Sequence, residues 1–195
     1  MQQEQRKPYK SARWKSFWGR VQTWFQGETV SKDYTAAAYA IADAPALKRK
    51  EVKFKQTEVQ FEGVHPEIVA FWKAMLQACK ARNIPVLAYE MLRTEERQNE
   101  LYAKGRSRVK GKNGSHVWGC AVDIVHATRY WQLSKKEWDI IGSIGKEVAR
   151  RRNIKITWGG DWDSIYDPAH WQLKNWRIRK DEPKIGRPRV TESYD

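Results

Sequence analysis

The sequence predicts an α+β domain in which a small antiparallel sheet is flanked by helices, with an amphipathic helical extension at the N-terminal end. Short strand-like segments and helical segments follow each other irregularly, without the βαβ rhythm of a parallel sheet. The 195 residues suffice for one domain with a core. A hydrophobic fraction of 41% and 11 Trp indicate a folded chain. We expect an extension over residues 1–62 that packs on the domain, a domain over residues 63–175 and a basic polar tail over residues 176–195.

The extension combines a clear pattern with two weaker ones. Residues 8–26 predict a basic amphipathic helix, because large apolar side chains recur every three or four residues. Such a helix either packs against the domain, which we favour, or lies on an anionic envelope or membrane surface. The alanine-rich run Thr35–Ala46 predicts a helix that Pro45 stops. The alternation in Val52–Phe61 predicts an edge strand or a hairpin.

The domain shows more regular signals. Helices are predicted from Pro66, where Pro suits the first turn, over Glu95–Ala103, and from Ser134, which forms a capping-box pair with Glu137. Short apolar runs predict four strands: Pro85–Met91, Ala121–Val125, Ile154–Trp158 and Trp171–Leu173. The segment after Lys174 is polar and is expected to be loosely held.

The net charge of +14 implies polyanionic partners, such as nucleic acid, anionic lipid or acidic envelope polymers. The chain contains no zinc finger or other recognisable nucleic-acid module, so we do not expect specific nucleic-acid binding. Two cysteines, Cys79 and Cys120, make neither a disulfide framework nor a CxxC metal site, and we interpret both as buried thiols.

Two of the four histidines stand in a pattern that indicates a metal site. His116 precedes Asp123 by seven residues, and His170 follows Asp167 by three. Two imidazoles and a carboxylate are a common donor set for catalytic zinc, because three protein ligands leave a fourth position open for water. A free carboxylate beside that position can act as the base, and a bend at Pro168 would bring Asp167 towards His170.

The full pattern resembles the zinc D-alanyl-D-alanine carboxypeptidase and L-alanyl-D-glutamate peptidase family, which includes many phage endolysins. In the family block Ser-x-His-x-x-Gly-x-Ala-x-Asp, the residues Gly119, Ala121 and Asp123 match in place, whereas Ser115 directly precedes His116 and is shifted by one. The later block WGGDWDSIYDPAHWQL and the earlier block LRTEERQNELYAKGRS (Leu92–Ser107) also resemble the family's. The resemblance covers about residues 64–173.

The resemblance implies a hedgehog and D-Ala-D-Ala-peptidase type of fold, and a role for each matching residue. His116, Asp123 and His170 would bind Zn²⁺, and Asp167 would be the general base. Arg93 would bind a substrate carboxylate or steady the oxyanion, tasks that suit a fixed guanidinium. Ser115 would hydrogen-bond the substrate or a metal ligand, although its register departs from the family's.

Some residues near this pattern have competing interpretations. His126 as a fourth ligand would close the site to water, so we expect it to be structural. Asp161 and Asp163 compete with Asp167 as the base but lack its spacing to His170. The basic run Lys104–Lys112 is either a solvated loop or a lip of the cleft that attracts carboxylates of the substrate.

The function that the resemblance implies is that of an endolysin: a bacteriolytic, zinc-dependent peptidase that cuts a stem-peptide bond of peptidoglycan, in the first place L-Ala–D-Glu. Two alternatives stay open: a D-Ala-D-Ala carboxypeptidase, and a non-catalytic zinc-bearing phage structural or cell-wall-binding module. The sequence has neither an apolar run of roughly 18–20 residues nor a secretory signal. We therefore expect the protein to stay cytoplasmic until phage lysis releases it to the cell wall. We also expect it to be a monomer.

Overall fold

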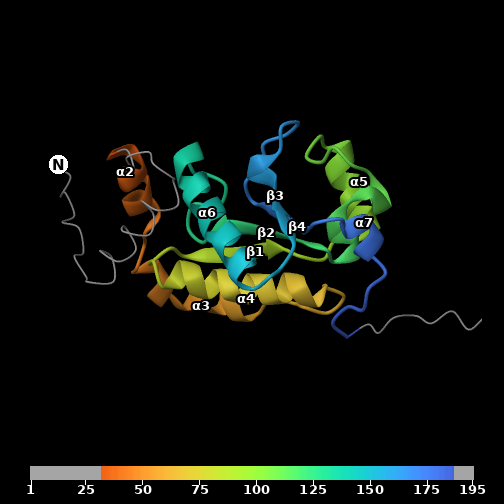
Figure 1. Ribbon diagram of the computed structural model, residues 1–195, viewed down its shortest axis with the longest axis horizontal. Helices are drawn as coiled ribbons and strands as arrows, with labels where there is room; N and C mark the ends of the chain where they lie inside the picture. Colours follow the sequence, from red (N-terminus) through yellow and green to blue (C-terminus); the bar gives the residue numbers. More distant parts are fainter. Residues whose placement is uncertain (1–31, 187–195) are drawn as a thin grey trace, which may run out of the picture.

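The computed structural model describes residues 32–186 (Figure 1), so the amphipathic helix expected over residues 8–26 lies outside the described residues. The described elements follow this order: α2 (Lys32–Ile41), the 3-10 turn η1 (Ala46–Lys48), α3 (Lys50–Thr57), α4 (Pro66–Lys80), β1 (Val86–Glu90), α5 (Glu95–Ala103), η2 (Gly111–Asn113), η3 (Ser115–Trp118), β2 (Ala121–His126), α6 (Lys135–Arg151), β3 (Ile156–Trp158), η4 (Gly159–Asp161), β4 (His170–Leu173) and α7 (Trp176–Arg179). The predicted α+β class and the four predicted strands are confirmed.

The four strands form one antiparallel sheet in the order β1-β2-β4-β3. In this register Asp123 on β2 lies directly opposite His170 on β4. On its other side Asp123 lies opposite Glu90, next to a β-bulge between Ala88 and Glu90. Because directly opposed residues project to the same face of a sheet, the register places three polar side chains in one row across three strands.

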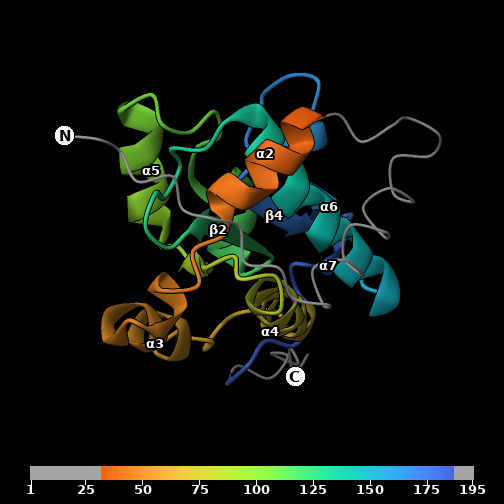
Figure 2. The ribbon, with the colours of Figure 1, turned by 90° about the vertical axis from the view of Figure 1, so that its left-hand side faces the viewer.

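The two faces of the sheet have different surroundings because side chains alternate along each strand. Val122, Ile124, Trp171 and Leu173 are fully buried in the core. The ring of Trp171 lies 5.0 Å from that of Phe71 on α4, and a Cβ added at Gly145 on α6 would come within 2.2 Å of Trp171. Both α4 and α6 therefore pack against the face that carries Trp171, and Figure 2 shows these two helices next to each other. The alternate residues, among them His170 and Gln172, line a cavity instead.

Local signals in the sequence account for where the two long helices begin. His65 caps α4 by accepting a hydrogen bond from the backbone N–H of Glu67 at 3.1 Å. The predicted capping box of α6 is present, with Ser134 and Glu137 each accepting from the other's backbone N–H. Glu137 is 4% exposed and also receives two hydrogen bonds from Arg129. Among the described helices, none combines the length and apolar character that crossing a membrane requires.

The strand or hairpin predicted over Val52–Phe61 is wrong, because α3 occupies most of this segment. A strand would place Val52 and Phe54 on one face, whereas Val52 is buried and Phe54 is 64% exposed. The buried face instead joins Val52 to Gln56, four residues later, as in a helix. The Gln56 amide donates a hydrogen bond to the carbonyl of Val86 on the edge strand β1. Tertiary contact with β1 therefore overrides the alternating pattern.

The expectation of a loosely held segment after Lys174 is also wrong as far as Gly186. Trp176 is 5% exposed. Arg179 forms ion pairs with Glu67 on α4, at 2.7 Å, and with Glu182, at 2.8 Å. Farther along, Ile185 exchanges backbone hydrogen bonds with the segment that precedes α4. One buried aromatic ring and these pairs attach a polar segment that has no strong apolar pattern of its own.

Candidate metal centre and active site

Strand pairing and one tight turn bring the predicted metal ligands together. Asp123 and His170 are direct neighbours across β2 and β4. His116 reaches them from η3, which ends at Gly119 in a left-handed conformation with φ 62°. A Cβ at this position would lie 2.1 Å from the carbonyl oxygen of Gly63, so both the turn and the close approach require glycine.

Three potential ligand atoms form a nearly equilateral triangle. His116 Nε2 lies 3.2 Å from Asp123 Oδ1 and 3.1 Å from His170 Nδ1, and His170 Nδ1 lies 3.1 Å from Asp123 Oδ1. Both histidines are almost completely buried. Among the described residues these three are a group whose donor atoms converge closely enough to hold one ion.

Hydrogen bonds on the outer sides of the two imidazoles determine which nitrogens face inwards unprotonated. His116 Nδ1 lies 3.1 Å from the carbonyl oxygen of Met91, which can only accept, so this nitrogen carries the proton. His170 Nε2 lies 3.1 Å from Gln172 Oε1 and donates to it. Neutral imidazoles therefore present lone pairs at His116 Nε2 and His170 Nδ1, facing Asp123 Oδ1.

Three lone pairs about 3.1 Å apart repel each other unless a proton or a metal cation lies among them. The pKa shifts of Asp123 and His170 also indicate that positive charge is favoured among these three atoms. Burial alone would raise the pKa of Asp123, but His116 and His170 hold it well below its ordinary value. Burial likewise opposes protonation of His170, yet Asp123 raises its pKa. The donor set therefore attracts a cation.

The triangle has the size that tetrahedral zinc requires. Donor atoms about 2.0–2.1 Å from a tetrahedral ion lie roughly 3.3–3.4 Å from one another. The observed edges of 3.1–3.2 Å are close to this value. Three protein donors leave a fourth position, and the cavity described below provides access to it. His116, Asp123 and His170 thus could hold Zn²⁺ in an open site.

Asp167 lies beside this triangle because the turn after β3 holds its backbone. Its N–H donates to the carbonyl of Gly159 and its own carbonyl accepts from the N–H of His170, both at 3.1 Å. A Cβ at Gly159 would lie 2.3 Å from the Asp167 carbonyl oxygen, so glycine is needed there. Burial raises the pKa of Asp167, while the neighbouring His170 opposes that rise. Within residues 32–186 its carboxylate has no hydrogen-bond partner, which leaves it available to a ligand in the cavity.

Arg93 contacts the same centre from the far side of Asp123. One of its terminal N–H groups lies 3.5 Å from Asp123 Oδ2, the oxygen that faces away from the histidines. The guanidinium also donates twice to Glu90 and, at 2.8 Å, to Gln98 Oε1. Most of its donors are therefore committed to protein acceptors, and the geometry supports orientation of the Asp123 carboxylate.

The sequence assigned no site role to Gln172, Glu90 or Gln98, whereas Ser115 was expected to hydrogen-bond the substrate or a metal ligand. Gln172 orients His170 and stands two residues after it on the same strand face, a spacing that could have identified it. Trp162 places its ring 5.2 Å from that of His170. Ser115 is buried, with its Oγ 3.4 Å from His170 Nε2, so it contacts a candidate ligand on the side opposite the triangle. No local pattern indicates the roles of Glu90 and Gln98, since both depend on the position of Arg93.

The residues that competed for a role lie elsewhere. His126 donates from Nε2 to the carbonyl of Ile41 at 3.1 Å and accepts at Nδ1 from backbone N–H groups that follow it, so both nitrogens are used structurally. Asp161 pairs with Lys146 at 2.6 Å. Cys120 is buried, and burial raises the pKa of its thiol to about 11. Asp163 is exposed and is absent from the cavity wall.

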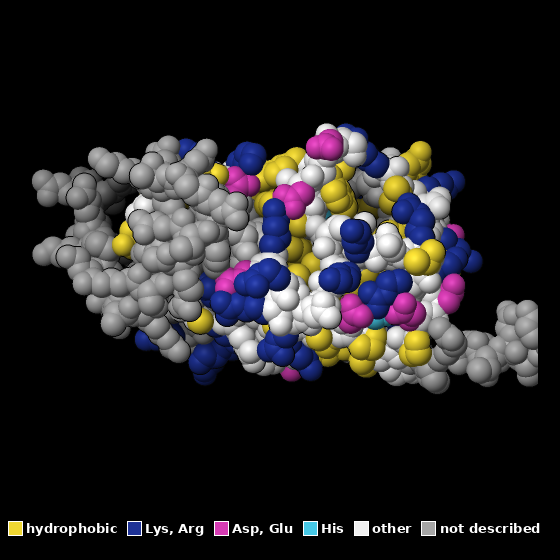
Figure 3. Space-filling model, viewed as in Figure 1, with side chains coloured by type: hydrophobic (Ala, Val, Ile, Leu, Met, Phe, Trp, Pro, Cys, Tyr) yellow, Lys and Arg dark blue, Asp and Glu magenta, His cyan; other side chains and the backbone are white. Residues whose placement is uncertain are grey.

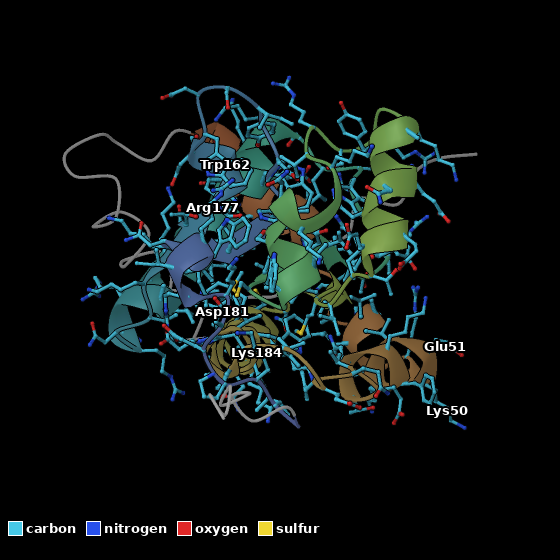
Figure 4. All side chains as sticks on the ribbon, turned by 90° about the vertical axis from the view of Figure 1, so that its right-hand side faces the viewer. Lys50, Glu51, Trp162, Arg177, Asp181 and Lys184 are labelled. Carbon is cyan, nitrogen blue, oxygen red and sulfur yellow. The ribbon has the colours of Figure 1, made fainter. Side chains whose placement is uncertain are left out.

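The candidate metal ligands, Asp167 and Arg93 all line one cavity of about 580 Å³. Its walls come from the sheet, from α5 and the loop after it, from the loop between η4 and β4, and from α7. Figure 4 shows Arg177 on α7 and Trp162 on the same side of the molecule, both of which line the cavity. Its size suits a short peptide.

Known proteins resemble the chain over this part. Residues 108–173, which include all three candidate ligands and Asp167, match the family model described as D-alanyl-D-alanine carboxypeptidase. An L-alanyl-D-glutamate peptidase of a Listeria phage is 31% identical over 103 residues, which are 52% of this chain and 34% of that protein. The peptidoglycan L-alanyl-D-glutamate endopeptidase CwlK of Bacillus subtilis is 26% identical over 129 residues, which are 56% of this chain and 73% of CwlK.

A solved structure supports the same relationship. The L-Ala D-Glu endopeptidase ChiX of Serratia marcescens aligns with a TM-score of 0.51 and 29% identity, covering 60% of this chain and 85% of ChiX. The chain spans only about a third of the length of the Listeria phage relative. The segment that the family model matches contains the converging histidines and aspartates, and the fold agrees with that of ChiX. Over this part the chain is thus similar to D-alanyl-D-alanine carboxypeptidases and L-alanyl-D-glutamate peptidases, and the similarity supports a metallopeptidase.

Proposed function

We propose that this chain is a zinc-dependent peptidoglycan peptidase of the endolysin type, which hydrolyses the L-Ala–D-Glu bond of the stem peptide. One observation carries the proposal: His116, Asp123 and His170 converge beside a free carboxylate, that of Asp167, in the wall of one cavity. The relatives named as L-alanyl-D-glutamate peptidases support the choice of bond. The description of the family model keeps the D-Ala-D-Ala carboxypeptidase as the alternative.

The proposed chemistry divides between the ion and the side chains. Zn²⁺ in such a site supplies Lewis acidity and lowers the pKa of water at its open position. Asp167 accepts a proton from the attacking water and returns it to the leaving amine. Because its pKa is raised, the Asp167 carboxylate takes up a proton more readily than an ordinary Asp does. It can then hold this proton until it passes to the leaving amine.

The remaining residues position these groups. Gln172 and the carbonyl of Met91 hold the outer N–H groups of the two histidines, which fixes both tautomers. Arg93 orients Asp123 and retains a donor at Nη1 that a substrate carbonyl or carboxylate can use. The buried hydroxyl of Ser115 steadies His170.

Digestion of purified peptidoglycan tests the proposal. Mass spectrometry should find new C-terminal L-Ala and new N-terminal D-Glu, whereas a carboxypeptidase would release free D-Ala and leave the L-Ala–D-Glu bond intact. Chelation should abolish the activity, and added Zn²⁺ should restore it. Cleavage that survives complete metal removal would refute the zinc mechanism.

Matched aspartate variants test the base. We expect Asp167→Asn to lower kcat by about 100-fold or more. The control is Asp161→Asn, which changes the same charge six residues away but removes only a surface pair with Lys146. Equal activity of the two variants would rule out Asp167 as the base. A non-catalytic wall-binding module would instead bind sacculi in pull-down experiments and release no new ends in any variant.

The proposed substrate sets the remaining expectations. Peptidoglycan lies in the bacterial cell wall, so we propose that the protein acts there, after phage lysis releases it. We also propose a monomer, to be measured by light scattering. The basic segment of residues 8–26, expected to contact either the domain or an anionic surface, lies outside the residues that the structure describes.

A further inference from the structure

Arginines are unusually numerous in the cavity wall. Arg93 is committed to Glu90 and Asp123, and Arg97 pairs with Glu100 at 3.0 Å. The other three have no carboxylate partner anywhere in residues 32–186; we call them the arginine rim, defined as Arg106, Arg108 and Arg177. All three arginines are exposed residues of the cavity wall. Lys and Arg side chains are abundant on the face shown in Figure 3, but acidic side chains lie among many of them.

Among the residues that the structure describes, no acidic residue of the cavity wall pairs with the arginine rim. Its acidic lining residues are Glu90, Asp123 and Asp167. Glu90 is paired with Arg93, Asp123 belongs to the candidate metal centre, and Asp167 carries the proposed base. Unpaired guanidinium groups at the entrance to a partly enclosed cavity create a positive potential that favours anionic ligands.

Two members of the arginine rim are held in place, Arg108 by a contact across the cavity wall and Arg177 by its neighbour in the chain. Arg108 Nη1 donates to the carbonyl of Ser164 at 2.8 Å, which joins the loop after α5 to the loop before β4. The guanidinium of Arg177 lies 4.6 Å from the ring centre of Trp176, which is itself buried. In Figure 4 the loop after α5 lies between α5 and α7. The rim therefore draws on two segments that are far apart in the sequence.

The loop that carries Arg106 and Arg108 is tied to the catalytic side of the cavity. The amide nitrogen of Gln98, a residue only 1% exposed, donates to Ser107 Oγ at 2.7 Å and to the carbonyl of Val109 at 2.6 Å. The amide oxygen of the same side chain accepts from Arg93 at 2.8 Å. Because one buried side chain holds both, the arginines keep a defined position relative to the metal centre.

We propose that the arginine rim is a carboxylate-binding subsite that selects acidic stem peptides over amidated ones. The inference rests on the proposed function. D-Glu is joined to the next stem residue through its γ-carboxyl, so its α-carboxylate stays free on the residue that directly follows the scissile bond, and further carboxylates can follow along the stem. Guanidinium groups bind carboxylates through paired hydrogen bonds and charge, and amidation removes both advantages.

Matched substrates and variants test this subsite. The substrates are two stem peptides that differ only in carrying D-Glu or its α-amide, D-isoglutamine, and kcat and KM are measured for each. For the unmodified enzyme we expect kcat/KM to favour the acidic peptide by about tenfold, largely through KM. The preference should weaken at high salt, because screening reduces interactions between exposed charges. In the triple variant Arg106→Gln, Arg108→Gln, Arg177→Gln the preference should fall to about one.

The same loop supplies the control. Lys104 and Lys110 carry the same charge but do not line the cavity. The double variant Lys104→Gln, Lys110→Gln should retain the preference, which separates a subsite from a general effect of net charge. If this control loses the preference as strongly as the rim variant, or if the rim variant keeps it, the subsite is refuted. Each single rim variant is measured as well, so that misfolding of the triple variant, detected by its melting temperature, does not decide the result.

A binding measurement keeps the two proposals distinguishable. If neither peptide is cleaved, the proposed function fails, and affinity for both peptides is then measured by calorimetry with Zn²⁺-loaded Asp167→Asn protein. Tighter binding of the acidic peptide that is lost in the rim variants supports the subsite independently of turnover. Equal affinity for the two peptides refutes it.

Discussion

The metal centre makes a quantitative prediction about thermal stability. A cation that binds the folded chain at His116, Asp123 and His170 and has no site in the unfolded chain must stabilise the fold. At a free Zn²⁺ concentration of about 100 times Kd the gain is about 2.7 kcal/mol. For a domain of this size 1 kcal/mol corresponds to roughly 2–4 °C, so the melting temperature should rise by about 5–11 °C when Zn²⁺ is added to chelated protein.

Asp123→Asn should remove most of this shift. Asp123 Oδ1 forms two of the three edges of the donor triangle, and its charge offsets that of the ion. If a neutral amide lowers the affinity by about 100-fold, the same Zn²⁺ concentration reaches only about Kd, and the gain falls to roughly 0.4 kcal/mol, or about 1–2 °C. Scanning fluorimetry with chelated and Zn²⁺-loaded samples measures both shifts, and circular dichroism checks that the variant is folded.

His126→Gln is the matched control, because His126 is also a buried histidine but binds the carbonyl of Ile41. This variant should melt at a lower temperature than the unmodified chain and keep the full Zn²⁺-dependent shift. A shift as large in Asp123→Asn as in the unmodified chain would refute the assignment of the donor triangle. Loss of the Zn²⁺-dependent shift in His126→Gln would also refute this assignment, because the ion would then bind elsewhere.

Three further predictions concern stability and reactivity. Hydrogen bonds from an arginine of α7 lower the pKa of Glu182 from 4.5 to about 2, so Glu182 stabilises the fold above about pH 4.5 and loses this effect as the pH falls towards 2. Glu182→Gln should therefore lower the melting temperature at pH 7 and differ less from the unmodified chain near pH 2; a pH-independent difference would contradict the pairing. Gly119→Ala should cost about 1–3 kcal/mol more in urea unfolding than Gly105→Ala, because both positions have positive φ but only Gly119 faces a backbone oxygen, 2.1 Å from an added Cβ. Burial raises the thiol pKa of Cys79 to about 12 and that of Cys120 to about 11, so both should react with a thiol reagent at pH 8 far more slowly in the folded chain than in urea.

The sequence alone determined the features that depend on near neighbours in the chain. The capping box of Ser134 and Glu137 is a three-residue pattern, and it lies where α6 begins. The apolar runs that predict strands coincide with β1 to β4, because alternating or fully buried segments carry their own signal. The chemical types and order of His116, Asp123 and His170 were likewise sufficient to predict a donor set, which the structure brings together.

Tertiary structure decided whatever depends on which segments meet. The alternating run that begins at Val52 is a helix because β1 offers Gln56 a carbonyl to bind. Arg93, predicted to face the substrate, has most of its donors engaged by Glu90, Gln98 and Asp123. Arg177 enters the cavity wall from a segment expected to be loose, since only the packing of α7 places it there.

The physical reason for this division is the range of the interactions. Capping, periodicity and turn preferences act over a few residues, so they can be inferred from the order of residues. The register that sets Asp123 opposite His170 and the shared cavity of the arginine rim arise from contacts between segments about 50 to 70 residues apart, and their energies appear only when the whole domain is packed. The sequence therefore determined what chemistry the site can hold, and the fold decided which side chains surround it.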